Sequence, residues 1–140
     1  MKKQIMTVLL AMAIAASLPR LTGADSIAFP ASPKASYMLL ADEEGSAYGI
    51  PPSEIKTVLK SESGYSQDAI GDHGMARGVA QYHKATFDRY EALYFNQTGS
   101  HLSYLLGTDQ VKLMAWQWRN YPKSRYEWST WRRIYGKGSA

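Results

Sequence analysis

A short helical pattern of apolar residues is the feature that most constrains how this chain can fold. Ile55, Val58 and Leu59 recur at spacings of three and four residues, which places their side chains on one face of a helix. Pro52 suits a first helical turn, and Gly64 suits the position just after the last turn. The sequence therefore predicts a helix from about Pro52 to the residue before Gly64, with its apolar face packed into a core.

Glu62 occupies the next place on this apolar face. It follows Ile55, Val58 and Leu59 by seven, four and three residues, so we expect its carboxyl group to point toward the interior or the wall of a cleft. Burial disfavours the charged form of a carboxyl group, and a carboxyl group that stays protonated near neutral pH can act as a general acid. The simpler interpretations are a solvated glutamate or one paired with a lysine or arginine. The position alone leaves these alternatives open.

The first 24 residues have the pattern of a secretory signal. Two lysines precede an apolar run from Ile5 to Leu18, and small residues lead up to Ala24, so we expect cleavage near Ala24. An uncleaved anchor is the alternative, but the run is shorter than the roughly 20 residues that span a bilayer. The chain has no cysteine, which excludes a disulfide framework and a lipoprotein anchor. We therefore expect an exported protein, secreted or periplasmic, with no stable membrane anchor.

Removal of this leader changes the charge of the protein. It takes away three basic residues and no acidic one, so thirteen basic and twelve acidic residues remain. Residues 25–109 carry six basic and eleven acidic side chains, whereas residues 110–140 carry seven basic side chains and only Glu127. The basic end could meet an anionic polymer or simply balance the acidic part. So low a net charge, with export, argues against nucleic acid as a partner.

The remainder is predicted to be one small domain of the α+β class, mostly α. Residues 25–47 contain two prolines and several serines and alanines and are predicted to be a linker or a loosely docked arm, so that the domain spans residues 48–140. Three glycines within residues 65–82 predict a loop or small hairpin after the first helix. Further helices are expected at about residues 84–95 and 108–120, with a short one at 101–106.

Three short motifs then point to a known family. Glu62-Ser63 closes the predicted helix, and Asp68-Ala69-Ile70-Gly71 and Gly78-Val79-Ala80-Gln81 follow it. In this order and spacing the chain resembles the lysozyme-like lytic transglycosylases of the SLT-domain family, which carry Glu-Ser, Asn/Asp-x-Ala-hydrophobic-Gly and Gly-Leu-Met-Gln. A later family motif, Ala-Tyr-Asn, is matched only loosely by Ala115-Trp116-Gln117. The resemblance covers roughly residues 48–135.

The resemblance implies an activity and a mechanism. It implies a lysozyme-like single domain, with a small hairpin or loop region after the catalytic helix, that cleaves the β-1,4 bond between MurNAc and GlcNAc in peptidoglycan. Glu62 would protonate the glycosidic oxygen and then accept a proton from the C6 hydroxyl of the muramic acid, which gives a 1,6-anhydro product. No cofactor is expected, and no metal, because the spacing of the three histidines matches no zinc pattern.

Six residues are predicted to bind substrate on this basis. Gln81 would position the sugar, although its amide could instead satisfy loop carbonyl and amide groups. Ser63 would bind the Glu62 carboxyl group or help to cap the helix. Tryptophan faces pack against sugar rings, but most aromatic residues of small domains lie in the core. The predicted substrate-binding residues are Ser63, Gly78, Gln81, Trp116, Gln117 and Trp128.

Two alternative functions stay open at this point. A hydrolase of the same fold would need a second carboxylate about 5 to 9.5 Å from the first. Asp68 and Asp72 are the candidates near in sequence, and Asp72 beside Gly71 is typical of a turn. A glycan-binding protein that keeps the cleft without turnover is the other alternative, which the altered Ala115-Trp116-Gln117 motif suggests. The small size would also suit an enzyme that serves a larger cell-envelope machine.

Overall fold

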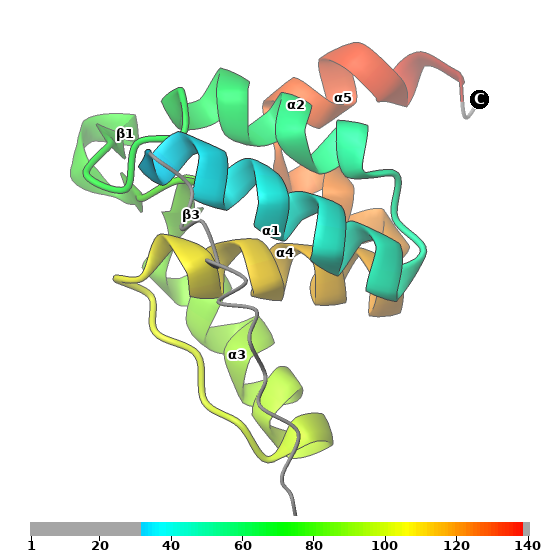
Figure 1. Cartoon of the computed structure of the whole chain (residues 1–140). Coiled ribbons are helices and arrows are strands. Elements are labelled where there is room, and N and C mark those ends of the chain that lie inside the picture. The colour runs from blue at the N-terminus through cyan, green and yellow to red at the C-terminus, as the bar shows by residue number, and fades with distance from the viewer. Residues whose placement is uncertain (1–31, 139–140) are drawn as a thin grey trace, which may run out of the picture.

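The computed structural model describes residues 32–138. The predicted signal segment, residues 1–24, lies outside this range. The described chain is mostly helical with one small antiparallel sheet, which confirms the predicted α+β, mostly α class (Figure 1). Its elements are α1 (Pro33–Tyr48), α2 (Pro52–Ser63), β1 (Ile70–Gly71), η1 (Asp72–Gly74), β2 (Ala76–Arg77), β3 (Tyr82–His83), α3 (Lys84–Thr98), α4 (Gly107–Asn120), η2 (Pro122–Glu127), α5 (Ser129–Tyr135) and η3 (Gly136–Gly138).

Helix α2 has the bounds that its sequence predicts. Gly64 follows it in the left-handed conformation with a φ of 62°, and its N–H donates to carbonyl groups of the last turn. A residue without Cβ takes this conformation at little cost. Ile55, Val58 and Leu59 are fully buried, so the face that continues to Glu62 is the face that packs into the protein.

Residues 33–48 correct the prediction of a linker or loosely docked arm over residues 25–47. They form α1, whose first turn is capped by the Ser32 side chain. The serine and proline at this point therefore mark the start of a helix rather than a linker. Helix α1 packs along α4 and α2 (Figure 1). Its buried residues are Tyr37, Ala41 and Gly45.

The other predicted helices are confirmed at 84–98 and 107–120, but no helix forms at 101–106. Side chains of α4 bind the backbone of this segment instead. The Ser103 N–H donates to Asp109 over 2.8 Å, and the Tyr104 carbonyl accepts from Gln110 over 2.7 Å. Because these partners satisfy the backbone, the segment needs no internal helical hydrogen bonds.

The sheet joins α2 to α3 and consists of three two-residue strands in the order β1-β2-β3. Gly71 pairs with Ala76, and Ala76 pairs with His83, all antiparallel. The predicted small hairpin is therefore a three-stranded meander. Strand β2 lies between β1 and β3. Gly71, Ala76 and His83 are therefore neighbours across the three strands, and the first two of them are small residues.

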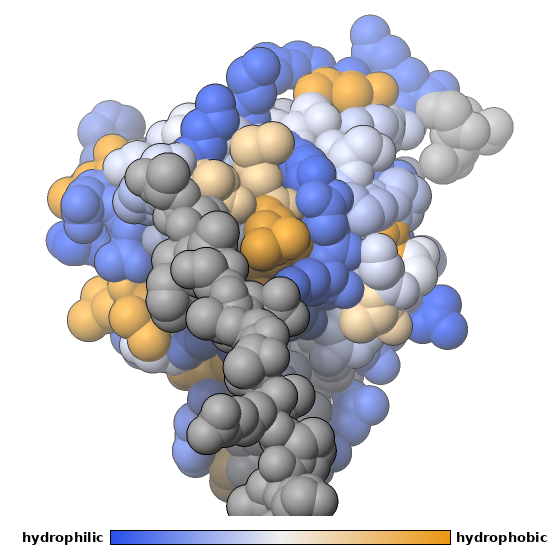
Figure 2. All heavy atoms as spheres, in the orientation of Figure 1, coloured by the Kyte–Doolittle hydropathy of each residue, from blue (hydrophilic) through white to orange (hydrophobic). Residues whose placement is uncertain are grey.

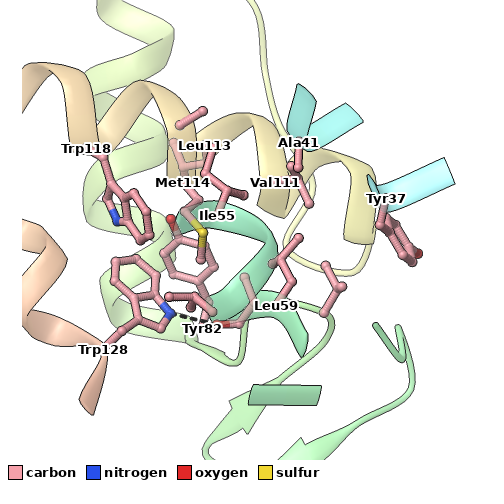
Figure 3. Packing of buried hydrophobic residues seen from close by; sticks show 14 of the residues in the cluster. Tyr37, Ala41, Ile55, Leu59, Tyr82, Val111, Leu113, Met114, Trp118 and Trp128 are labelled. Carbon is pink, nitrogen blue, oxygen red and sulfur yellow. Dashed lines mark hydrogen bonds between the residues drawn. The ribbon is translucent and has the colours of Figure 1, made fainter. Parts of the chain in front are cut away.

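Helix α4 is the centre of the core. Nine of its residues are buried, and α1, α2 and α3 all pack against it. Figure 3 shows side chains of α2 and α4 converging on Tyr82 and Trp128, which come from the sheet and from the end of η2. The chain has no cysteine, so its stability depends on noncovalent packing, above all on apolar burial around α4.

None of the helices within residues 32–138 is long and apolar enough to cross a membrane. On the face seen in Figure 2, hydrophobic residues form small separate patches among hydrophilic ones. Scattered apolar residues of this kind are normal on a folded domain.

We expect Ala41→Asp to destabilise the protein strongly, because Ala41 is fully buried on α1. An unpaired buried carboxylate costs several kcal/mol, so urea denaturation should show a free energy of unfolding lower by about 3 kcal/mol or more. Ala47→Asp places the same side chain at an exposed position of the same helix and should change it by less than about 0.5 kcal/mol. Equally small effects in both variants would contradict the docking of α1.

Candidate active site

A cavity of about 460 Å³ lies where the end of α2, the sheet, the start of α3 and the junction of η2 with α5 meet. This volume falls within the range of about 300 to 1,000 Å³ that is usual for ligand sites. Carboxyl, imidazole, amide and aromatic side chains share its wall. Among the lining residues are Glu62, Asp72, Gln81, His83, Glu127 and Trp128.

Glu62 lies in the last turn of α2 and is half-buried. Its place in the cavity wall agrees with the orientation expected from the apolar face of that helix. The three apolar residues before it on this face are fully buried. They fix the rotation of α2 about its axis, and so they determine where the carboxyl group points.

Ser63 does not line the cavity, but it holds the backbone next to Glu62. Its hydroxyl donates to the carbonyl of Val79 over 2.7 Å and lies 3.1 Å from the Leu59 carbonyl. It also accepts from the N–H of Tyr65 over 3.1 Å. These contacts cap the end of α2 and fasten the Gly78–Gln81 segment beside Glu62, whereas no hydrogen bond to the Glu62 carboxyl group is found within residues 32–138.

Gly78 is buried on the other side of this segment, against α4. Its φ is 81°, and a Cβ atom there would collide with the side-chain amide of Gln110. Gln110 is itself buried; it accepts from the N–H of Ala80 over 3.0 Å and donates to the carbonyl of Arg77 over 3.2 Å. Gly78 therefore permits a close approach to a protein side chain and takes no part in the cavity wall.

Gln81 does line the cavity. Its φ of 51° is unusual for a residue with a side chain. The side-chain Nε2 donates to the carbonyls of Ala69 and Gly78 over 3.1 and 2.9 Å. The amide thus satisfies loop carbonyl groups, as the simpler interpretation expected, while the residue also faces the cavity.

Trp128 forms another part of the cavity wall. Its Nε1–H donates to the Ala80 carbonyl over 2.8 Å, and its ring packs edge to face against Tyr82 and Trp118. Only 6% of the residue is exposed. These contacts hold the indole ring in one position, and only a small edge of it is exposed to the cavity. A sugar ring could not stack on its face.

Trp116 and Gln117 are not brought to the cavity; the structure places both in the core. Trp116 donates to the Gln97 side chain over 3.1 Å. The Gln117 carbonyl oxygen accepts from the Tyr82 hydroxyl over 2.8 Å. Burial raises the pKa of Tyr82 well above its ordinary value, and the Glu127 carboxylate adds to this shift. The phenol therefore stays a neutral donor to Gln117 beneath the cavity.

The cavity holds two carboxylates besides Glu62, and one of them was not foreseen. Asp72 lines it as one of the two candidates near in sequence, but Asp68 lies at a separate hollow. Glu127, in η2, is the additional one. It accepts from Arg89 over 2.9 Å and from Tyr90 over 3.0 Å. Its isolation as the only acidic residue of 110–140 was the signal that could have drawn attention to it.

Residues 40–105, which include Glu62 and the whole sheet, match the family model described as Transglycosylase SLT domain. This match supports the assignment of the chain to the SLT-domain family. Its fold is accordingly the lysozyme-like SLT fold, and the family acts on peptidoglycan by transglycosylase-type cleavage. Neither the curated proteins nor the solved structures that were compared contain a match to the chain.

We expect Ser63→Ala to weaken the SLT domain, because it removes the hydroxyl that fastens Val79 to α2. The loss of this hydrogen bond leaves a carbonyl group without its partner, so the free energy of unfolding should fall by about 1 to 2 kcal/mol in urea denaturation. Ser53→Ala changes an exposed serine of the same helix and should have almost no effect. Identical denaturation curves for the two variants would contradict the anchoring role of Ser63.

Proposed function

We propose that this protein is a peptidoglycan lytic transglycosylase in which Glu62 acts first as acid and then as base. The substrate bond is the β-1,4 bond between MurNAc and GlcNAc, and the product carries a 1,6-anhydro end. The main support for the proposal is that Glu62 lines a cavity of the size usual for ligand sites. Glu62 lies at the end of α2, within the segment that matches the family.

The proposed reaction needs one carboxyl group. The protonated Glu62 gives its proton to the glycosidic oxygen while the bond from this oxygen to C1 breaks and positive charge develops on the sugar ring. The resulting carboxylate then takes the proton of the C6 hydroxyl as that oxygen attacks C1. Glu62 ends the cycle protonated, so no water is consumed and no cofactor is needed.

The rest of the cavity wall suits a sugar. Trp128 offers an apolar edge, and Thr86 and Ser129 offer hydroxyl groups. Binding sites for small polar molecules commonly combine apolar surface with a few placed hydrogen-bonding groups. In this proposal Gln81 shapes the wall beside Glu62, while its amide group holds the loop.

The proposal includes export, since peptidoglycan lies outside the cytoplasmic membrane and the first 24 residues have the pattern of a signal. A secreted or periplasmic location is therefore part of it. Service to a larger cell-envelope machine stays a prediction from the small size of the chain.

We expect Glu62→Gln to reduce the release of soluble fragments from purified peptidoglycan by a factor of about 100 or more, because the amide cannot donate the required proton. Mass spectrometry of the fragments made by the wild-type protein should show 1,6-anhydro ends. Glu43→Gln, at an exposed position of α1, is the matched control and should leave the rate unchanged.

Two results would contradict the proposal. Full activity of Glu62→Gln would remove Glu62 from the reaction. Binding of the wild-type protein to peptidoglycan with no soluble fragments at any pH would instead support a glycan-binding protein.

A further inference from the structure

His83 and Asp72 form a pair in the wall of the cavity that also contains Glu62. The His83 Nε2 lies 2.9 Å from the Asp72 Oδ2, and each side chain is a little under half exposed, at 47% and 45%. Both groups are therefore open to water, and the proposed transglycosylase step uses neither of them.

The sheet brings this pair together. His83 is on β3 opposite Ala76, which is in turn opposite Gly71 on β1, and Asp72 follows Gly71 directly. The Asp72 side chain thus reaches across the middle strand, where the small side chain of Ala76 leaves room. Ala76 itself lines the cavity.

Unusual backbone geometry accompanies the pair. Asp72 and His73 have φ values of 46° and 54°, in the left-handed region. Two consecutive residues with side chains rarely adopt it, and such strain gathers at functional sites. Asp72 does form a turn, as its place between Gly71 and His73 predicts, but the turn also aims its carboxylate at His83.

The pair is a close contact between an imidazole and a carboxylate, at 2.9 Å, and imidazoles are the commonest general bases. A neutral imidazole that carries its proton on Nε2 keeps a lone pair on Nδ1 that can accept a proton. No hydrogen bond of the His83 Nδ1 is found within residues 32–138. The third carboxylate of the cavity, Glu127, is less suited to this role because Arg89 and Tyr90 already bind its Oε1 atom.

We infer that His83, oriented by Asp72, is a second catalytic base that activates water, so that this enzyme forms reducing ends as well as anhydro ends. The inference rests on the proposed function, in which Glu62 protonates the glycosidic oxygen. As the bond from C1 to that oxygen breaks, the water oxygen bonds to C1 and His83 takes one water proton. The proton then passes to solvent, and Glu62 regains one from solvent. In total one water is consumed for each bond cut.

The experiment is digestion of purified peptidoglycan in water enriched in ¹⁸O, with both kinds of fragment end counted by mass spectrometry. The wild-type protein should give anhydro ends and also ¹⁸O-labelled reducing ends. His83→Gln should lower the rate of reducing-end formation at least about tenfold while anhydro ends form at an unchanged rate. Asp72→Asn should shift the ratio in the same direction. His101→Gln changes a histidine that does not line the cavity and whose side chain is 72% exposed, and it should keep the wild-type ratio.

Three results would overturn the inference. The first is the absence of ¹⁸O from the fragments made by the wild-type protein. The second is a His83→Gln protein with the wild-type ratio of reducing to anhydro ends. The third is a His83→Gln protein that has the wild-type melting temperature but forms both kinds of end equally more slowly. If His83→Gln does not fold, the ratio in Asp72→Asn decides by the same criterion. Other results would contradict the proposed function itself. In that case the Glu62→Gln protein would still form both kinds of end, or the wild-type protein would release no fragments.

Discussion

The candidate active site depends on how the short backbone segment from Gly78 to Gln81 is held. Side chains from three different parts of the chain bind it: Ser63 from the end of α2 over 2.7 Å, Gln110 from α4 over 3.0 Å and Trp128 from the end of η2 over 2.8 Å. Each bond satisfies a backbone group that would be costly to bury alone. Together they place the wall of the cavity beside Glu62 and leave it little freedom to move.

The residues of the family motifs near Glu62 hold the backbone of the site in place. Their hydrogen bonds and contacts are with other parts of the protein. The serine after Glu62 caps α2 and holds Val79. The glycine at position 78 gives space to Gln110. The amide of Gln81 binds two loop carbonyl groups. In physical terms these residues preorganise the position of one carboxyl group, which is the larger part of what a site of this kind requires.

Sequence patterns predicted the parts of the molecule that depend on local signals. The bounds of α2 followed from Pro52 and Gly64, and the orientation of Glu62 followed from the spacing of its apolar face. Helix α1 was missed because its proline and serine also suit a linker, and only its packing on α4 distinguishes the two. Trp116 and Gln117 were beyond sequence reasoning for a related reason: their positions depend on contacts between distant segments. Glu127 gave only the signal of an isolated acidic residue, and its place in the cavity depends on such contacts too. The tyrosine at position 82, for example, joins the sheet to Gln117 in α4.

In the proposed reaction the Glu62 carboxyl group delivers a proton to the glycosidic oxygen. The most direct measurement is a crystal structure of the Glu62→Gln protein with a bound peptidoglycan oligosaccharide. We predict that the sugar chain occupies the cavity lined by Gln81 and Trp128, with the side-chain amide at position 62 about 3 Å from a glycosidic oxygen. An oligosaccharide bound elsewhere on the domain, or one whose glycosidic oxygens all lie beyond hydrogen-bonding distance of position 62, would contradict it.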